Sequence, residues 1–272
     1  MTLIDISPKA SLSSFLESCE AHGFNAPMIE RIALKTVAHL RGTRADRAQS
    51  VALQELELRW YKSLENGGCP DYGVYESDAY MGELWACWAV YSRNYLRAIR
   101  RSNSLGRGSV LSSIGNARRV IDLGCGFGWT TASLKQMFVS AEVIGTNLDG
   151  TRQTAMARSV GNHYGFEVVP DVACVNKAAD LIFASEYFEH ILEPVDHLNE
   201  VLDAVSPKAM LIANAFGTRA IGHFESYNVG GKTVSSKAAS KAFNDTLRGR
   251  GYMRAKTKMW NNRPAYWKKV GV

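Results

Sequence analysis

The sequence predicts an α/β fold in which a mostly parallel sheet carries helices on both faces and follows a helical N-terminal extension. The first observation is a change of pattern at Arg118, after which short β-rich runs alternate with segments of helical periodicity. This alternation is typical of parallel strands joined by crossover helices. The second observation is that apolar residues before about residue 65 recur at helical spacing, as at Leu53, Leu56 and Trp60.

The N-terminal extension is predicted to hold three short helices and then a longer aromatic helix from Tyr80 to Leu96. The aromatic side chains of the longer helix either pack on the main domain or cover a ligand as a lid. Three short helices are also compatible with a DNA-binding helix-turn-helix. The Ser/Gly-rich residues 102–117 are the best candidate for a connector. We therefore predict a helical extension or lid over residues 1–115 and an α/β domain over residues 116–272.

The elements of the α/β domain follow one another with short connections. After the fifth strand, a polar loop beyond Phe216 leads to another helix and then to two strand-like segments, which would end the sheet with a hairpin. The predicted strands are residues 118–124, 142–147, 166–169, 179–186, 208–215, 252–260 and 265–270, and the predicted helices are residues 130–138, 151–165, 194–205 and 236–251.

The composition is typical of a globular protein, and the sequence shows neither a metal-binding motif nor a membrane-spanning segment. Of the 272 residues, 46% are hydrophobic and 21% charged, which is ordinary for a protein with a packed core. No apolar stretch approaches the ~18 residues of a membrane span, and the first residues lack the pattern of a secretory signal. The cysteines form no CxxC pair, so we expect no disulfide framework and no metal site. These observations predict a cytoplasmic protein.

A glycine loop follows the first predicted strand and leads directly into a helix. The segment from Val120 to Gly128 reads VIDLGCGFG, with glycines at every second position. A dinucleotide-binding GxGxxG loop would need a small residue where this chain has Trp129, and a P-loop would need Gly-Lys-Ser/Thr, which is absent. A purely structural glycine turn is the remaining alternative. Glycines of this kind let the backbone turn tightly and approach a ligand closely.

This segment resembles the first motif of the class I S-adenosylmethionine-dependent methyltransferases, an acidic residue followed by GxGxG. The resemblance implies a Rossmann-like fold with a seven-stranded sheet and S-adenosylmethionine as cofactor. It places Asp122 near the amino-acid part of the cofactor and the loop beneath its methionine and ribose. The loop residues assigned to cofactor binding are Gly124, Cys125, Gly126 and Gly128.

Later segments continue the resemblance in the same order. The family's second strand ends in an acid that binds the ribose, and this chain departs from that pattern with Asn147, followed by Leu148. An amide still hydrogen-bonds a hydroxyl, and Asp149 is an alternative if the loop curls back. The resemblance further assigns Asp171 and Val172 to the adenine.

The fourth predicted strand gives the second match. Residues 180–191 resemble the D-x-x-x-x-x-E-x-x-E-H pattern of many small-molecule methyltransferases, and the cofactor site then includes Ser185 and Glu186. Since the carboxyl ends of parallel strands form the binding crevice, Glu189 and His190 are expected to face it.

Three residues are candidates for catalysis. His190 has the most suitable ordinary pKa for a general base, with a structural role in its loop as the equal alternative, and Glu189 accompanies it. His223 lies in the loop after the fifth strand, which commonly contacts the acceptor in this fold. Neither the Asn-Pro-Pro-aromatic motif nor the Pro-Cys nucleophile of two DNA methyltransferase classes is present.

The predicted function is methyl transfer to a small-molecule, nucleotide or nucleic-acid acceptor. A nucleotide or nucleic-acid partner stays open because the chain carries a net charge of +6 and its C-terminal segment interleaves cations with aromatics. The alternative, favoured by Asn147, is a catalytically inactive methyltransferase-like scaffold, possibly associated with nucleic acid. The sequence leaves the oligomeric state undetermined. The cations are Arg248, Arg250, Arg254, Lys256, Lys258, Arg263, Lys268 and Lys269, and the aromatics are Tyr252, Trp260, Tyr266 and Trp267.

Overall fold

The computed structural model describes residues 8–42, 50–65, 68–101, 110–175, 177–255 and 263–271. The strands are β1 (Arg119–Leu123), β2 (Glu142–Thr146), β3 (Glu167–Val169), β4 (Leu181–Ser185), β5 (Ala209–Ala213), β6 (Ser226–Val229), β7 (Lys232–Ser235), β8 (Tyr252–Ala255) and β9 (Ala265–Lys269). The α-helices are α1 (Pro8–Ala21), α2 (Ala26–Leu40), α3 (Val51–Leu64), α4 (Asp78–Cys87), α5 (Arg93–Arg101), α6 (Val110–Ile114), α7 (Trp129–Met137), α8 (Arg152–Tyr164), α9 (Pro194–Val205) and α10 (Ser236–Gly249). The short helices are η2 (Tyr72–Glu76), the π-helical η3 (Trp88–Ser92), η4 (Val172–Cys174) and η5 (Phe188–His190).

Seven strands form one sheet in the order β3-β2-β1-β4-β5-β9-β8. β1 to β5 pair in parallel, whereas β9 is antiparallel to both β5 and β8. The strand order reverses between β1 and β4, and a crevice at the carboxyl ends of parallel strands is expected at this point. The predicted α/β fold with a mostly parallel seven-stranded sheet is confirmed.

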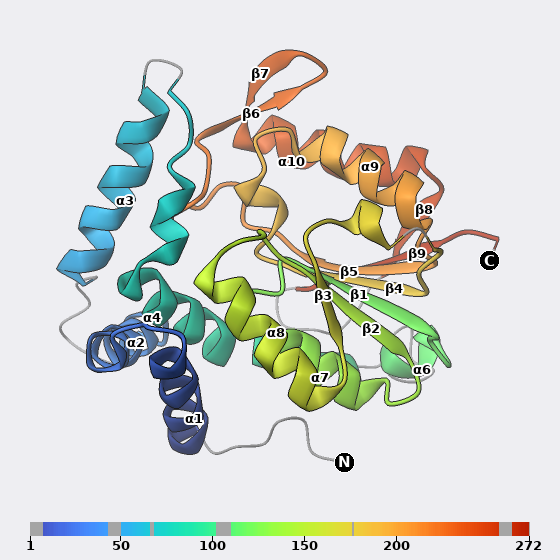
Figure 1. The fold of residues 1–272 in the computed structure, drawn as a ribbon. Coiled ribbons are helices and arrows are strands. Elements are labelled where there is room, and N and C mark those ends of the chain that lie inside the picture. Colours follow the sequence, from blue (N-terminus) through green and yellow to red (C-terminus); the bar gives the residue numbers. More distant parts are fainter. Residues whose placement is uncertain are drawn as a thin grey trace.

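Each face of the sheet has its own hydrophobic core, because side chains of successive residues in a strand point to opposite faces. Along β4, Leu181 and Phe183 belong to the core that includes α7 and α8, while Ile182 and Ala184 belong to the core that includes α9 and α10. Figure 1 shows these helix pairs on opposite sides of the sheet. The continuous apolar runs of the sequence reflect burial on both faces.

The N-terminal helices share both cores with the sheet. Phe15 of α1 packs its ring 4.8 Å from that of Phe127, which lies in the glycine loop. On the other side, Leu53 and Trp60 of α3 lie in the core of α9 and α10. These helices therefore stand over the carboxyl ends of the strands, as the blue and teal part of Figure 1 shows. The division at residue 115 stays a prediction.

One local expectation is confirmed with an added detail, and two are corrected. The predicted helix from Tyr80 to Leu96 is α4, η3 and α5 in succession, with a π-helical segment in its middle. Part of the expected connector, Val110–Ile114, forms α6, and Val110 is fully buried in the core. The polar loop expected after Phe216 contains the β6–β7 hairpin. The first part of the expected connector, residues 102–109, lies outside the described residues, as does the end of the predicted strand 252–260 beyond Ala255. Within the described part of the chain, no helix is long and apolar enough to span a membrane.

The contact between α3 and the loop after β5 gives the first testable prediction. The indole Nε1 of Trp60 donates a hydrogen bond of 2.8 Å to the buried carbonyl oxygen of His223. The variant Trp60→Phe leaves that carbonyl without its donor, so we expect a loss of about 1–3 kcal/mol in the free energy of unfolding, measured by urea denaturation.

The matched control is Tyr61→Phe on the same helix. Its half-buried hydroxyl donates a longer bond, 3.3 Å, to the Ala220 carbonyl, so its removal should cost clearly less. Equal losses in the two variants would contradict the assignment of Trp60 as the main attachment of α3 to this loop.

Candidate active site

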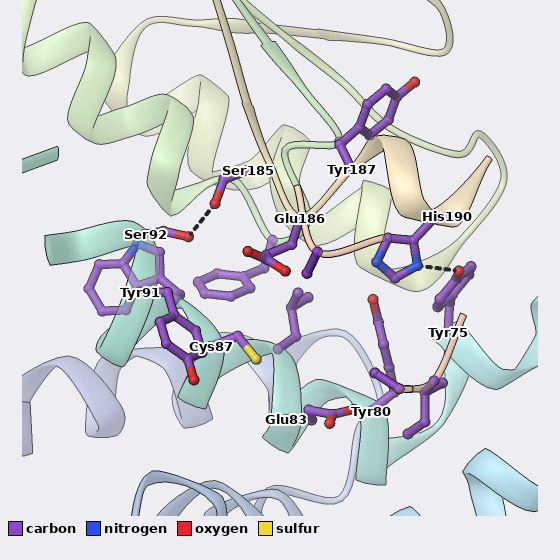
Figure 2. Close-up of a pocket in the computed structure, with 18 of the residues that line it drawn as sticks. Tyr75, Tyr80, Glu83, Cys87, Tyr91, Ser92, Ser185, Glu186, Tyr187 and His190 are labelled. Carbon is purple, nitrogen blue, oxygen red and sulfur yellow. Dashed lines mark hydrogen bonds between the residues drawn. The ribbon is translucent and has the colours of Figure 1, made fainter. Parts of the chain in front are cut away.

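A cavity of about 810 Å³ lies between the carboxyl ends of the strands and the N-terminal helices. One end is formed by the glycine loop and the ends of β1 and β2, and the other by η2, α4 and the loops after β4 and β5. Figure 2 shows Glu186 and His190 facing Tyr75, Tyr80 and Glu83 across this space. The cavity thus joins residues from both halves of the chain.

The glycine loop keeps the shape that the sequence predicts. Gly124 has φ of +68°, and a Cβ at this position would lie 2.5 Å from Cδ2 of Tyr187, so only glycine fits here. The Cys125 amide donates to the Thr146 carbonyl at 2.8 Å, which ties the loop to β2. Gly126 also lines the cavity, and Gly128, with φ of +90°, is the N-cap of α7.

Asp122, one residue before the end of β1, places a buried carboxyl group at the cavity wall. Its Oδ2 accepts a hydrogen bond of 2.6 Å from the Thr131 hydroxyl. Burial raises the pKa of Asp122 to about 7, against the lowering effect of the Thr131 hydrogen bond. A buried carboxyl group of this kind is suited to bind a cationic group, which would stabilise its charged form.

Asn147 has a role that a carboxylate could not take. Its amide Nδ2 donates to the Gly126 carbonyl at 2.8 Å, and its Oδ1 accepts the Leu148 amide at 3.0 Å. A carboxylate lacks the donor of the first bond, so the departure from the family pattern fastens the glycine loop to the end of β2. Leu148 lines the cavity beside it. Asp149 is exposed and pairs with Arg158 at 2.7 Å, so it does not replace Asn147.

The two residues predicted to contact the adenine are not brought to the cavity. Asp171 is exposed, and its carboxylate accepts the Ala173 amide as the N-cap of η4. Val172 is buried in the core of α9 and α10. Their neighbour Pro170 is the residue of this turn that lines the cavity.

The residues after β4 line the other end of the cavity. Glu186 has φ of +52°, a left-handed conformation that costs free energy in any residue other than glycine and that often marks functional sites. The Ser185 hydroxyl lies 3.4 Å from that of Ser92 on η3. Burial, and then the charge of His223, lower the pKa of His190 well below its ordinary value, so the ring is neutral near pH 7. His190 Nδ1 is hydrogen-bonded to the Tyr75 hydroxyl at 3.0 Å.

Glu189 and His223 complete this end of the site. Glu189 is fully buried, and its Oε1 accepts the Ala215 amide at 2.7 Å. The His223 ring lies edge-on to the His190 ring with centroids 4.6 Å apart. Glu186, Glu189 and His223 bring one potential ligand atom each to within 4.8 Å of one another, so they are the group of described residues that is able to hold a metal ion.

Sequence reasoning missed the contribution of η2 and α4 to the site. Tyr75, Tyr80 and Glu83 line the cavity, and burial, with the charge of Glu57 as a second cause, raises the pKa of Glu83 to about 7. The aromatic run before residue 96 was the available signal, and it indicated a lid without identifying which side chains enter the site.

The described part of the C-terminal segment does not present aromatics for base stacking. Tyr252, Tyr266 and Trp267 are all buried within the sheet. Arg250 pairs with Asp203, and Arg248 with Asp245. Trp260, Lys256 and Lys258 lie outside the described residues.

The strand order, the reversed β9 and the glycine loop after β1 define a Rossmann-like fold of the class I methyltransferase type. Residues 121–213 match the family model described as a methyltransferase domain. Over residues 121–213 the chain is therefore similar to the methyltransferase domain that this model describes. No curated protein sequence matches it significantly.

Solved structures align with this chain at low sequence identity, and one of them, with a TM-score above 0.5, shows the same fold. An O-methyltransferase family protein from Burkholderia thailandensis aligns over 100% of this chain and 90% of its own, with 13% identity and a TM-score of 0.52. A sugar N-methyltransferase from a Streptoalloteichus species aligns over 68% of this chain and 89% of its own, with 14% identity and a TM-score of 0.48. A Galdieria sulphuraria protein assigned as a sarcosine dimethylglycine methyltransferase has 18% identity and a TM-score of 0.33, and the match covers 38% of this chain and 42% of that one.

The contact between Tyr75 and His190 depends on a glycine, which gives a second prediction. Gly222 has φ of +83°, and a Cβ there would lie 2.2 Å from the Tyr75 hydroxyl oxygen and 2.4 Å from His190 Nδ1. We expect Gly222→Ala to separate the two side chains and to lower the free energy of unfolding by about 2 kcal/mol or more. Gly217→Ala in the same loop meets nothing within 4 Å and is the matched control. Equal stability of the two variants in urea denaturation would contradict this packing.

The raised pKa of Glu83 gives a third prediction, on the pH dependence of stability. Between pH 4.5 and about 7 the folded protein binds more protons at Glu83 than the unfolded chain, so this residue's contribution to stability falls as pH rises through that window. Glu83→Gln removes the effect. The variant should be more stable than the wild type at pH 8, by about 1 kcal/mol or more, and the difference should shrink toward pH 5.

The control for Glu83 is Glu55→Gln, which changes an exposed glutamate on α3. Its stability should follow the wild type across the same pH range in thermal denaturation. If the difference in stability between Glu83→Gln and the wild type stayed constant with pH, the raised pKa of Glu83 would be contradicted.

Proposed function

We propose that the protein binds S-adenosylmethionine against the glycine loop and catalyses transfer of its methyl group to a small-molecule acceptor in the same cavity. The observation that carries the proposal is the cavity itself. It runs without interruption from Asp122 and Gly126 to Glu186 and His190. The cofactor and the acceptor would therefore bind next to each other. Placing the two reacting atoms in line is the main requirement of methyl transfer.

The residues at the glycine-loop end suit the cofactor. The buried carboxyl group of Asp122 would bind its ammonium group, and Gly126 leaves the backbone accessible to a ligand. Asn147 uses one hydrogen of Nδ2 and one lone pair of Oδ1 in bonds within the protein. The other hydrogen of Nδ2 and the other lone pair of Oδ1 are available to ribose hydroxyls. When bound, the cofactor supplies an electrophilic methyl group on a sulfonium.

The opposite end suits a small acceptor. Helices η2 and α4 cover it, and Tyr75 and Tyr80 contribute aromatic surface with hydroxyl groups at its edge. A concave cavity that helices partly cover favours a small molecule over a polymer, which needs an open groove. The neutral imidazole of His190 is able to accept a proton from an acceptor, and the Tyr75 hydroxyl would orient the ring.

A calorimetric titration with S-adenosylmethionine tests the proposal. We expect binding of micromolar strength or tighter by the wild type. Asp122→Asn keeps the shape of the side chain but removes its charge, so we expect binding to weaken by about 10-fold or more through loss of a charge-assisted interaction.

Asp149→Asn provides the matched control because it makes the same chemical change at an exposed aspartate beyond the end of β2. This variant should bind as tightly as the wild type. Absence of binding to the folded wild-type protein would refute the proposed function and direct attention to a non-catalytic binding role for the domain.

A further inference from the structure

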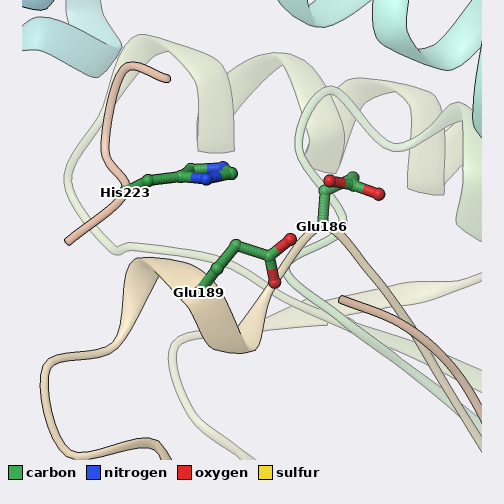
Figure 3. A group of neighbouring side chains, drawn as sticks. All are labelled: Glu186, Glu189 and His223. Carbon is green, nitrogen blue, oxygen red and sulfur yellow. The ribbon is translucent and has the colours of Figure 1, made fainter. Parts of the chain in front are cut away.

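Two carboxyl groups and an imidazole converge beneath the acceptor end of the cavity. Glu186 follows β4, Glu189 lies in η5, and His223 lies in the loop after β5. One potential ligand atom from each lies within 4.8 Å of the others. Figure 3 shows the Glu189 carboxylate between the His223 ring and the Glu186 carboxylate. Glu186 and His223 also line the cavity, so the cluster is open to it.

One oxygen of this cluster is buried without a donor group of its own. Glu189 has no exposed surface, and its Oε1 is satisfied by the Ala215 amide, but its Oε2 has no donor unless the adjacent Glu186 carboxyl group shares a proton with it. A buried carboxylate oxygen without a partner is costly and calls for an explanation. The neighbouring Glu186 adds a second carboxyl group, and the two negative charges together would repel each other. Either a shared proton or a bound cation removes this cost.

The orientation of His223 favours the cation. Its Nδ1 lies 2.8 Å from the Thr218 carbonyl oxygen, which is only an acceptor, so Nδ1 carries the hydrogen. The lone pair is therefore on Nε2. A histidine whose other ring nitrogen donates to a backbone carbonyl is the usual arrangement around a bound metal. Trp60 further fixes the backbone of this residue through its bond to the His223 carbonyl.

Glu186 is held at the cluster by its backbone. A left-handed φ of +52° is unfavourable for glutamate and has to be maintained by the surroundings. Its amide donates to the Ala213 carbonyl at 2.8 Å, which anchors the residue to the end of β5. Both glutamates thus follow β4 in the chain and are hydrogen-bonded to the end of β5 or just beyond it, and a ligand set supported by such rigid elements keeps its geometry.

We propose that Glu186, Glu189 and His223 bind a divalent transition-metal cation whose open coordination positions face the acceptor. Two carboxylate oxygens and one imidazole nitrogen suit Mn²⁺, Fe²⁺, Co²⁺ or Zn²⁺. Binding of the ion is independent of the cofactor, whereas its role rests on the proposed function. There the ion would bind an acceptor oxygen and lower the pKa of its hydroxyl group, which would release its proton to the neighbouring His190 imidazole.

Metal titration of the full chain tests this proposal without reference to activity. The protein is treated with EDTA, dialysed, and titrated with Mn²⁺ under electron paramagnetic resonance detection and with Co²⁺ by visible absorption. We expect one equivalent of tightly bound ion in the wild type, with cobalt bands typical of mixed oxygen and nitrogen ligands. Glu189→Gln keeps the oxygen that accepts the Ala215 amide, so it should fold, while its ion binding weakens by about 10-fold or more. His223→Ala should show the same loss.

Two variants control for non-specific binding at exposed side chains. Glu225→Gln lies two residues from His223 but is exposed, and His163→Ala removes an exposed histidine on α8. Both should bind one equivalent as the wild type does. The proposal would be overturned if the wild type bound no equivalent of metal ion, or if Glu189→Gln and His223→Ala bound it as tightly as the wild type. Glu186 and Glu189 would then share a proton instead. The metal titrations contain no S-adenosylmethionine. Their outcome therefore does not change if the protein fails to bind the cofactor in the calorimetric test.

Discussion

The hydrogen bond between the Trp60 indole and the His223 carbonyl joins the helical layer to the sheet at the point where the site is built. Through it, α3 holds the loop that follows β5. The same loop carries Gly222, whose missing side chain lets Tyr75 reach His190. The end of the cavity that Glu186 and His190 line therefore depends on a contact between segments about 160 residues apart in the chain. The N-terminal helices are part of the site rather than an addition to it.

Burial of ionisable groups is the second constraint, and it opposes stability. Asp122 and Glu83 both have carboxyl groups whose pKa is raised to about 7 by burial, and His190 is held neutral by the same cause. Glu186 adds the cost of a left-handed backbone. A fold selected for stability alone would place apolar residues at such positions. These unfavourable features lie around one cavity. Such a concentration indicates a functional site, at which side chains that lower the stability of the fold are retained for binding or chemistry.

The fold was predictable from the sequence because its signals are local. Apolar runs bounded by turns predict the strands of the parallel sheet, and the glycine pattern after Asp122 predicts the loop that the structure shows. The hairpin β6–β7 escaped prediction because its strands are short and mostly polar. The helix α6 escaped because serine and glycine around it indicated a connector.

The site was predictable only in part, because much of it depends on contacts that have no local pattern. Asp171 was placed near the cavity by its position in the chain, yet its side chain turns back to cap η4. No periodicity shows that Glu83 enters the cavity. Nor does any pattern place His223 beside Glu189, since that depends on how the loop after β5 is held. Asn147 was read as a weakened cofactor contact, whereas the structure adds its bond to the Gly126 carbonyl.

A crystal structure of the full chain with S-adenosylhomocysteine tests most directly the claim that sheet and helices enclose one cavity for two ligands. The account predicts density for the ligand between Asp122, Gly126 and Asn147, with α3 and α4 still covering the strand ends. Glu186 and His190 should border the space that remains beyond it. Ligand bound outside the cavity, or a cavity opened by displacement of α3 and α4 into a surface groove, would contradict the account.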